Sequence, residues 1–412
     1  MITIKPFRGY RPEKGLENRI ASKPYDVLSH NNALEIGNEN PLSFVHIIRP
    51  EIDMPEDTNP YSNEVYKNAG KALQDFIDRG YLVEEEKKVL YIYRQIMNGR
   101  EQNGIVGCIA IDDYGEGRIK RHEFTRVDKE KDRINHFYAA QANTEPVFLF
   151  YKKKDELNRF IENWTSNNQP VYDFTSEDGV KQILWVVDDG NSIQNIQKVF
   201  KDIDSLYIAD GHHRTASSYK VGLTMREENT DYTGEEEFNY FLSVIFPGDE
   251  LYIMPYNRIV KDLNGNSEEQ FLEKVSKGFD IEPLKSLTQP MKKHEIAVAF
   301  KDKAYKIIPK KDIFNNADEI DCLDASILQN NILAPILGIE DPRVDNRIEF
   351  YGGEGMIGTI INRLNDDMQV AFLLYPTQIE EITAVSDINK VMPPKSTWFE
   401  PKLMSGLFVH KF

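Results

Sequence analysis

Cysteine is scarce in this chain of 412 residues, which contains only Cys108 and Cys322. Two cysteines cannot form the network of disulfide bonds that stabilises small secreted domains. The first residues, MITIKPFRGYRPEKG, lack the apolar segment of a signal peptide, and no stretch approaches the roughly 18 uninterrupted apolar residues of a membrane-spanning helix. The sequence therefore predicts a cytoplasmic protein without a membrane partner.

Positive charge is also in short supply. The 50 Lys and Arg residues are outnumbered by 67 Asp and Glu residues, so the formal net charge is -17 at pH 7. A field of this sign repels phosphate backbones and anionic membrane surfaces. We therefore expect a small-molecule substrate and no nucleic-acid partner, and any anion site must be built locally. The sequence does not distinguish a monomer from a homo-oligomer.

Several catalytic signatures are missing. The chain has no Walker A sequence and no serine in a G-x-S-x-G elbow. The zinc-protease pattern H-E-x-x-H fails because Arg126 stands four residues after His122. The glycines of YGGEGMIG satisfy G-x-G-x-x-G, but the acidic residue that a dinucleotide site needs about twenty residues later is absent until Glu380. These absences argue against P-loop, serine-hydrolase, zinc-protease and dinucleotide-binding enzymes.

The chain nevertheless carries enough apolar mass to fold, with 40% hydrophobic and 11% aromatic residues. Apolar residues recur at helical spacing in SNEVYKNAGKALQDFIDRGYL, and shorter helical patterns occur in DELNRFIENW, NSIQNIQKVFKDI, SEEQFLEKVSKGF and ASILQNNILAPILG. Segments rich in β-branched and aromatic residues predict strands: SFVHIIRP, VLYIYRQI, NGIVGCIAI, PVFLFY, QILWVV, SLYIAD, YFLSVIF, LYIMPY, EIAVAF and QVAFLLYP. Because no regular βαβ repeat occurs, we expect an α+β fold with mixed sheets and packed helices.

An acidic stretch, Met225–Phe238, contains Gly234 and offers the clearest candidate boundary. It predicts an N-terminal α+β region over residues 1–235 with the HEFT and DGHHR blocks. The C-terminal α+β region would then cover residues 236–412 with the MPPKST block.

The stretch SLYIADGHHRTASSYKVG predicts a strand, a tight turn and a helix that starts near Thr215. Gly211 allows a ligand to approach the backbone closely, and the first N–H groups of a helix are unpaired and carry partial positive charge. His212, His213 and Arg214 add side-chain donors, and an arginine fork suits phosphate oxygens. The turn therefore predicts an anion site. Histidines that only cap the helix or form hydrogen bonds within the protein would be compatible with the same sequence.

Carboxylates and cations elsewhere offer further candidates. Asp210 ends the strand and could hold Mg²⁺, accept a proton or cap the helix. In RHEFT, Glu123 and its neighbour His122 indicate either an active-site strand or an exposed salt-bridge ladder. Candidate substrate-binding residues occur in three other blocks, KPFRGYRP, KPYDVLS and MPPKSTWFEPK, where a structural role explains them equally well. These residues are Arg8, Asp26, Lys395, Ser396, Thr397 and Lys402.

The block ADGHHR resembles the signature of a bacterial and archaeal family catalogued as domain of unknown function 1015. Other blocks resemble the same family in order along essentially the whole chain: KPFRGYRP, KPYDVLS, RHEFT with KDR, EDGVKQILWVVDD, MPYNRIV and MPPKSTWFEPKLMSGL. The strand, turn and helix are also similar to the phosphate-binding box of the ParB/sulfiredoxin-like superfamily, some of whose members are free serine kinases. The reactive cysteine of the sulfiredoxin box is replaced here by His212.

This wider resemblance implies a ParB/sulfiredoxin-like nucleotide-binding substructure in which Gly211, His212, His213, Arg214 and Thr215 hold the phosphates of ADP or ATP. Phosphoryl transfer to a small hydroxylated acceptor such as free L-serine is the reaction it favours. Mg²⁺ would bridge the phosphates at Asp210, and the carboxylate of Asp210 or Glu123 would orient the acceptor. A phosphatase that handles phosphoserine and a non-catalytic, nucleotide-responsive regulator are the alternatives.

Overall fold

The computed structural model describes residues 1–353 and 355–412, and these residues divide into two compact units. Unit 1 comprises Met1–Leu251 and Pro401–Phe412, and unit 2 comprises Tyr252–Glu400. The boundary expected at residues 235 and 236 lies inside unit 1, because the strand that follows it is a central strand of the unit 1 sheet. The last twelve residues also belong to unit 1, although all of unit 2 precedes them in the chain.

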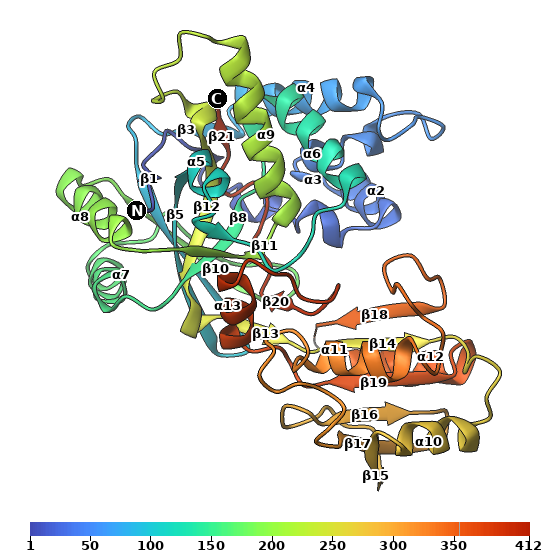
Figure 1. Cartoon of the computed structure of the whole chain (residues 1–412). Coiled ribbons are helices and arrows are strands. Elements are labelled where there is room, and N and C mark those ends of the chain that lie inside the picture. The colour runs from blue at the N-terminus through green and yellow to red at the C-terminus, as the bar shows by residue number, and fades with distance from the viewer. Residues whose placement is uncertain (354) are drawn as a thin grey trace. The chain divides into compact units, whose positions relative to one another are not determined.

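Unit 1 is built on a mixed sheet with the strand order β6-β11-β8-β12-β5-β4-β10-β9, to which β1 adds beside β5 (Figure 1). Two neighbouring pairs, β6 with β11 and β8 with β12, are parallel, and the other pairs are antiparallel. The strands of unit 1 are β1 (Ile4–Lys5), β2 (Tyr10–Pro12), β3 (Leu82–Glu84), β4 (Leu90–Met97), β5 (Arg100–Ala110), β6 (Ile119–Lys120), β7 (Ala142–Asn143), β8 (Val147–Tyr151), β9 (Tyr172–Thr175), β10 (Lys181–Val187), β11 (Leu206–Asp210), β12 (Tyr240–Pro247) and β21 (His410–Lys411). Of these, β2 pairs with β3 and β7 pairs with β21 in two separate small sheets.

Two groups of helices accompany this sheet. Helices α7 and α8 supply Leu157, Ile161, Ile196 and Phe200 to the core on one face, and α4, α6 and α9 pack against one another in a separate layer (Figure 1). The helical segments are α1 (Glu17–Ile20), η1 (Tyr25–Val27), α2 (His30–Glu39), α3 (Val45–Ile48), η2 (Pro50–Asp53), α4 (Asn63–Asp78), α5 (Ile111–Gly115), α6 (Val127–Ala140), α7 (Asp155–Asn167), α8 (Gly190–Lys201), α9 (His212–Glu228), η3 (Glu237–Asn239) and η4 (Gly248–Glu250).

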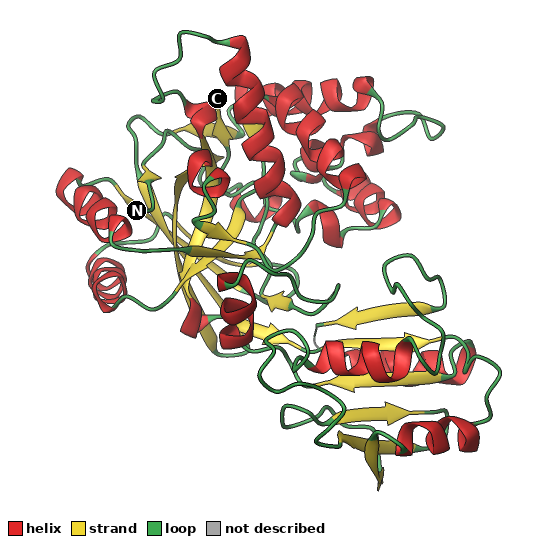
Figure 2. Cartoon of the chain, in the orientation of Figure 1, coloured by secondary structure: helices red, strands yellow, loops and turns green. Residues whose placement is uncertain are grey.

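Unit 2 is built on an antiparallel sheet with the order β15-β17-β16-β19-β14-β18, which Figure 2 shows with its own helices. Helices α10 and α11 share one hydrophobic core with this sheet, and α12 shares another. The elements are β13 (Tyr252–Met254), β14 (Tyr256–Val260), α10 (Glu268–Ser276), β15 (Phe279–Leu284), β16 (Ile296–Ala299), β17 (Ala304–Pro309), α11 (Asp324–Leu328), η5 (Gln329–Leu333), β18 (Ile348–Gly352), α12 (Met356–Asp366), β19 (Val370–Leu374), α13 (Ile379–Asp387) and β20 (Trp398–Glu400). The predicted α+β class with mixed sheets and packed helices is confirmed.

The glycine-rich segment after β18 serves packing. A Cβ atom on Gly352 would lie 2.4 Å from the indole of Trp398, and Gly353 has a φ of +98° beside the same ring. These glycines make room for Trp398, and the surrounding sheet is antiparallel. The segment therefore lacks the parallel βαβ setting of a dinucleotide-binding loop.

One predicted strand is wrong. SFVHIIRP contains helix α3 and the start of η2, and Phe44, Ile47 and Ile48 are buried in a single core cluster. The β-branched composition of this segment favours a strand, but residues three and four positions apart share one face only in a helix. Burial of that apolar face outweighs the local preference.

Gly406 lies within the twelve residues that return to unit 1 and packs closely on Phe44. A Cβ atom at this position would lie 2.6 Å from the ring of Phe44, and the φ of +84° already disfavours other residues. Gly117 has a similar φ of +76° with no atom within 4 Å, which makes it a matched control.

We predict that Gly406→Ala destabilises the protein more than Gly117→Ala. Both substitutions carry about 1–2 kcal/mol of left-handed strain, and Gly406→Ala adds about 1–3 kcal/mol of overpacking. Urea unfolding of the two variants measures the difference in their free energies of unfolding. Equal decreases in the two variants would contradict the tight packing of Gly406 on Phe44.

Candidate functional site

The site begins where β11 ends and α9 starts. Gly211 occupies the N-cap position with φ +92° and ψ +32°, a left-handed conformation that favours glycine, and no side chain caps the helix. The Gly211 N–H donates to Oδ1 of Asp210 at 2.8 Å, while Thr215 donates its N–H and its hydroxyl to the Gly211 carbonyl at 2.9 and 3.0 Å. The turn is rigid, and the start of this long helix offers unpaired N–H groups.

Arg214 is the most deeply buried cation of the turn, with its side chain 3% exposed. Its Nη1 donates to the carbonyl of Pro146 at 2.6 Å, and its Nη2 lies 3.9 Å from Oδ1 of Asp210. Its Nε is buried and has no hydrogen-bond partner among the described residues. A Cβ atom on Gly211 would lie 3.0 Å from this Nε, so the absence of a side chain at Gly211 leaves space beside the guanidinium.

Asp210 is held by two cations. Its Oδ2 accepts a hydrogen bond from Nζ of Lys402 at 3.1 Å, and the Arg214 guanidinium lies on its other side. Burial alone would raise the pKa of Asp210, but Lys402, Arg214 and the Gly211 N–H together lower it far below its ordinary value. Asp210 is therefore a carboxylate at neutral pH, and its side chain remains 25% exposed.

The histidines of the turn pair with the segment between β6 and α6. The His122 N–H points at Nε2 of His212 at 3.5 Å, and the two rings meet edge to face with centroids 4.6 Å apart. The Arg126 N–H donates to Nε2 of His213 at 3.0 Å. Because β6 and β11 are parallel neighbours, their carboxyl ends bring the RHEFT and DGHHR blocks to the same edge of the sheet.

Burial keeps these imidazoles neutral. It lowers the pKa of His122 to about 4. Burial is also the main reason that the pKa of His212 lies well below its ordinary value, and the neighbouring His122 opposes a second protonation. Burial also lowers the pKa of His213. In this site the positive charge at neutral pH therefore comes from Arg214 and Lys402, and the histidines contribute neutral hydrogen-bonding groups.

A buried charge cluster lies behind Arg214. Glu145 is 1% exposed, and its Oε1 accepts hydrogen bonds from the Tyr25 N–H and the Ser405 hydroxyl, both at 3.0 Å. Arg133, 4% exposed, lies 3.7 Å from Oε2 of Glu145 and 2.9 Å from Oδ2 of Asp132. Burial raises the pKa of Glu145, while Arg214 and Arg133 oppose that effect. This cluster supports Arg214 electrostatically from within unit 1.

The structure brings together only part of the predicted site set. Asp210, Gly211, His212, His213, Arg214, Thr215, His122 and Lys402 meet at the turn, and Glu123 is half-buried in the adjoining RHEFT segment. Asp26 is exposed and contributes to the electrostatic field at Arg214 and His213. Arg8 donates instead to the Glu85 carbonyl at 2.9 Å and pairs with Glu84 at 3.2 Å, and Lys395, Ser396 and Thr397 belong to unit 2.

Sequence reasoning did not identify Arg133, Asp132 and Glu145 as supports of the site. Charged residues are mostly exposed, so nothing in their spacing indicates burial. The one available signal was the KDR block, which contains Asp132 and Arg133.

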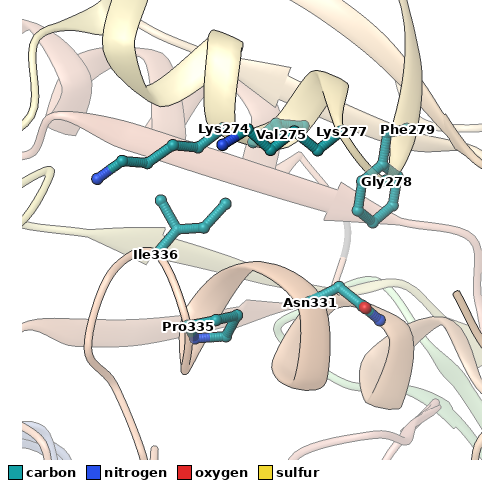
Figure 3. A pocket seen from close by; sticks show the side chains of 8 residues that line it. All are labelled: Lys274, Val275, Lys277, Gly278, Phe279, Asn331, Pro335 and Ile336. Atoms are coloured by element: carbon teal, nitrogen blue, oxygen red, sulfur yellow. The ribbon is translucent and has the colours of Figure 1, made fainter.

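No group of three or more His, Cys, Asp or Glu side chains suited to a metal ion occurs within residues 1–353 and 355–412. No helix in this part of the chain is long and apolar enough to cross a membrane. A cavity of 370 Å³ in unit 2 lies between α10 and the segment around η5, lined in part by Lys274, Phe279 and Asn331 (Figure 3).

Neutral, buried His122 makes the stability of unit 1 depend on pH. In the unfolded chain the His122 imidazole protonates near pH 6.5, whereas in the folded protein it protonates only near pH 4. The stabilisation is therefore complete above pH 6.5 and is lost as the pH falls toward 4, at a cost of about 3 kcal/mol.

We predict that His122→Asn flattens the dependence of the unfolding free energy on pH in this window. His30→Asn, which removes an imidazole with a 51% exposed side chain, is the control. Urea unfolding between pH 7 and pH 4 measures both, and a His122→Asn curve parallel to the wild-type curve would refute the assignment.

Solved structures with limited similarity were found. SbnI from Staphylococcus aureus, with a C-terminal truncation, has a TM-score of 0.37 and 10% identity over 73% of this chain and 85% of its own. A free serine kinase in complex with AMP has a TM-score of 0.36 and 13% identity over 78% of this chain and 93% of its own. A conserved hypothetical protein from Pyrococcus furiosus has a TM-score of 0.33 and 14% identity over 74% of this chain and 95% of its own. No curated protein matches the sequence.

A family model does match the sequence over most of its length. The matched residues, 4–326, include the KPFRGYRP, RHEFT and DGHHR blocks and extend into unit 2. A match of this extent confirms the family resemblance that the sequence blocks indicated. The chain belongs to the family described as "Protein of unknown function (DUF1015)".

Proposed function

We propose that the turn from Asp210 to Thr215 binds the phosphate groups of a nucleotide, and that the protein transfers a phosphoryl group to a small hydroxylated acceptor such as free L-serine. The observation that carries the proposal is the buried Arg214 Nε without a partner, beside a glycine at the start of a 17-residue helix. A buried donor left unpaired is costly, so a ligand acceptor at this position would relieve that cost.

The charges of the turn support an anionic ligand. Arg214 and Lys402 both lie beside Asp210, so two cations share one carboxylate there. The start of α9 adds a partial positive charge, and it has no side-chain cap that would compete with a ligand. In a chain with a net charge of -17, two cations gathered at one helix start are suited to phosphate oxygens.

The chemistry of Asp210 also suits Mg²⁺ bound together with a nucleotide. Mg²⁺ commonly uses one or two protein carboxylates and takes its other ligands from phosphates and water. Asp210 supplies an ionised, partly exposed carboxylate for this purpose, and Lys402 would then turn from Asp210 toward the phosphates. Bound Mg²⁺ would neutralise charge on the phosphates during transfer.

The acceptor hydroxyl needs a carboxylate that orients it and receives its proton. Asp210 is a weak base because its pKa is lowered, so its charge suits metal binding and orientation better than proton transfer. Glu123 is half-buried in the segment that follows β6, at the same sheet edge as the turn. We assign proton acceptance to Glu123, while His122 positions His212 through the edge-to-face contact of their rings.

We predict that Arg214→Met weakens the binding of ADP and ATP, measured by calorimetry with Mg²⁺, by about 10- to 100-fold. A charge-assisted hydrogen bond contributes about 1.5–3 kcal/mol. Arg226→Met removes an arginine from the same helix that pairs with Asp112 at 2.8 Å, so it serves as the matched control. Unchanged nucleotide affinity in a folded Arg214→Met protein would refute the phosphate role.

We further predict that Glu123→Gln lowers the rate of phosphoryl transfer from ATP or ADP to L-serine by about 10²- to 10⁴-fold, the usual contribution of a positioned base. Nucleotide affinity should stay the same, because Glu123 is not assigned to the phosphates. Glu116→Gln, at a position whose side chain is 61% exposed, is the control.

The assay follows phosphoserine formation and phosphate release with and without serine. Serine-independent release of phosphate would favour a phosphatase instead of a kinase. Nucleotide binding with no turnover at all would favour a regulator.

A further inference from the structure

Arg258 of unit 2 is a buried cation without a carboxylate partner. It lies on β14, between β18 and β19, and is 4% exposed (Figure 1). Its guanidinium donates to two backbone carbonyls, those of Tyr256 and, at 3.1 Å, Lys395. No carboxylate of residues 1–353 or 355–412 lies within the 4.0 Å of an ion pair. Carbonyl groups satisfy donors but do not neutralise the charge.

Among residues 1–353 and 355–412, the groups beside Arg258 are an aromatic ring and a carboxylate that is already hydrogen-bonded. The ring of Phe350 lies 5.6 Å from the guanidinium carbon. Asp324 interacts with Arg258 electrostatically from beyond ion-pair distance, but its Oδ1 already accepts hydrogen bonds from the N–H and Nδ1 of His294, both at 3.0 Å. Burial lowers the pKa of Arg258 to about 10, as expected for a guanidinium without a counter-charge.

A second cation, Lys395, lies over the ring of Tyr256, the residue whose carbonyl accepts a hydrogen bond from Arg258. Nζ of Lys395 is 5.8 Å from the centre of the Tyr256 ring. Lys395 has a φ of +59°, a conformation that is uncommon for residues other than glycine. Three hydrogen bonds hold the turn in this form: Arg258 to the Lys395 carbonyl, Thr377 to the Ser396 carbonyl at 2.7 Å, and the Ser396 hydroxyl to the Pro393 carbonyl at 2.6 Å. Strain that the surroundings maintain in this way commonly marks a functional site.

We propose that Arg258 and Lys395 form an oxyanion-binding site in unit 2, which takes the carboxylate or phosphate group of a small molecule. A buried cation such as Arg258 needs a compensating charge, and its guanidinium fork matches both planar carboxylates and tetrahedral phosphates, while the exposed Lys395 adds a second positive charge. Both residues belong to unit 2, whereas the turn at Asp210–Thr215 belongs to unit 1, and the proposal does not depend on the function proposed for that turn. It gives the MPYNRIV and MPPKST blocks a common role, because Arg258 belongs to the first and Lys395 to the second.

Hydrogen–deuterium exchange of the full chain, followed by mass spectrometry, locates such a site. Inorganic phosphate and acetate are the two probes, each compared with chloride at equal ionic strength. A probe at ten times its dissociation constant should slow exchange of the Lys395–Trp398 amides about tenfold, if exchange needs the unbound state. Slowing by phosphate alone assigns a phosphate group, and slowing by acetate assigns a carboxylate.

Variants test the assigned residues. Arg258→Met should abolish the slowing, whereas Arg343→Met, which removes an exposed arginine of unit 2, should retain it. Lys395→Asn removes the second cation and keeps a residue that tolerates positive φ, so it should weaken the slowing even if Arg258→Met fails to fold. Slowing that persists in a folded Arg258→Met protein, or that is unchanged in Lys395→Asn, overturns the site.

The same data separate the two proposals. Slowing confined to residues 210–215 overturns the unit 2 site and leaves the function proposed for the turn standing. Slowing at Lys395–Trp398 that persists in Arg214→Met supports the unit 2 site, whatever happens at the turn. No slowing at Lys395–Trp398 with either probe also overturns it.

Discussion

The burial of Arg214 is the constraint on which the candidate site depends. A guanidinium that is 3% exposed needs acceptors and counter-charges, and unit 1 supplies them from several parts of the chain. The Pro146 carbonyl precedes β8, Asp210 ends β11, and Glu145 belongs to the charge cluster behind the turn. Its buried Nε has no hydrogen-bond partner among the described residues, so the fold positions the arginine and leaves this donor for another molecule.

Burial also decides which side chains carry the positive charge at the turn. The block DGHHR contains two histidines that could be cationic, yet burial keeps both His212 and His213 neutral at pH 7. The cation that replaces them comes from Lys402, 192 positions away from its partner Asp210. The site thus takes its second cation from a residue far along the chain.

Local features of this protein could be predicted from the sequence. The helical spacing in SNEVYKNAGKALQDFIDRGYL indicates α4, whose buried residues include Val65, Ala69, Leu73 and Phe76, and the strand, glycine and helix around Gly211 follow one another directly in the chain. The α+β class with mixed sheets followed from the irregular order of strands and helices. These predictions rest on neighbours a few residues apart.

Distant pairings could not be predicted. Lys402 was expected to contact substrate, but nothing in its own block indicates that Asp210 is its partner. Arg133 and Glu145 are buried, although arginine and glutamate are usually surface residues. The composition of Ser43–Pro50 is typical of a strand, although tertiary packing makes the segment helical. In each case the deciding contact lies far along the chain, where spacing and composition give no information.

The return of residues 401–412 to unit 1 affects the order of folding during synthesis. All of unit 2 emerges from the ribosome before Lys402 can reach Asp210. Unit 2 begins and ends on paired strands, with Tyr252 opposite Glu400 in the β13–β20 pair. Once it folds, the long loop between Asp210 and Lys402 becomes short, and the entropic cost of closing it falls. Folding of unit 2 thereby favours the pairing of Asp210 with Lys402, although both residues belong to unit 1.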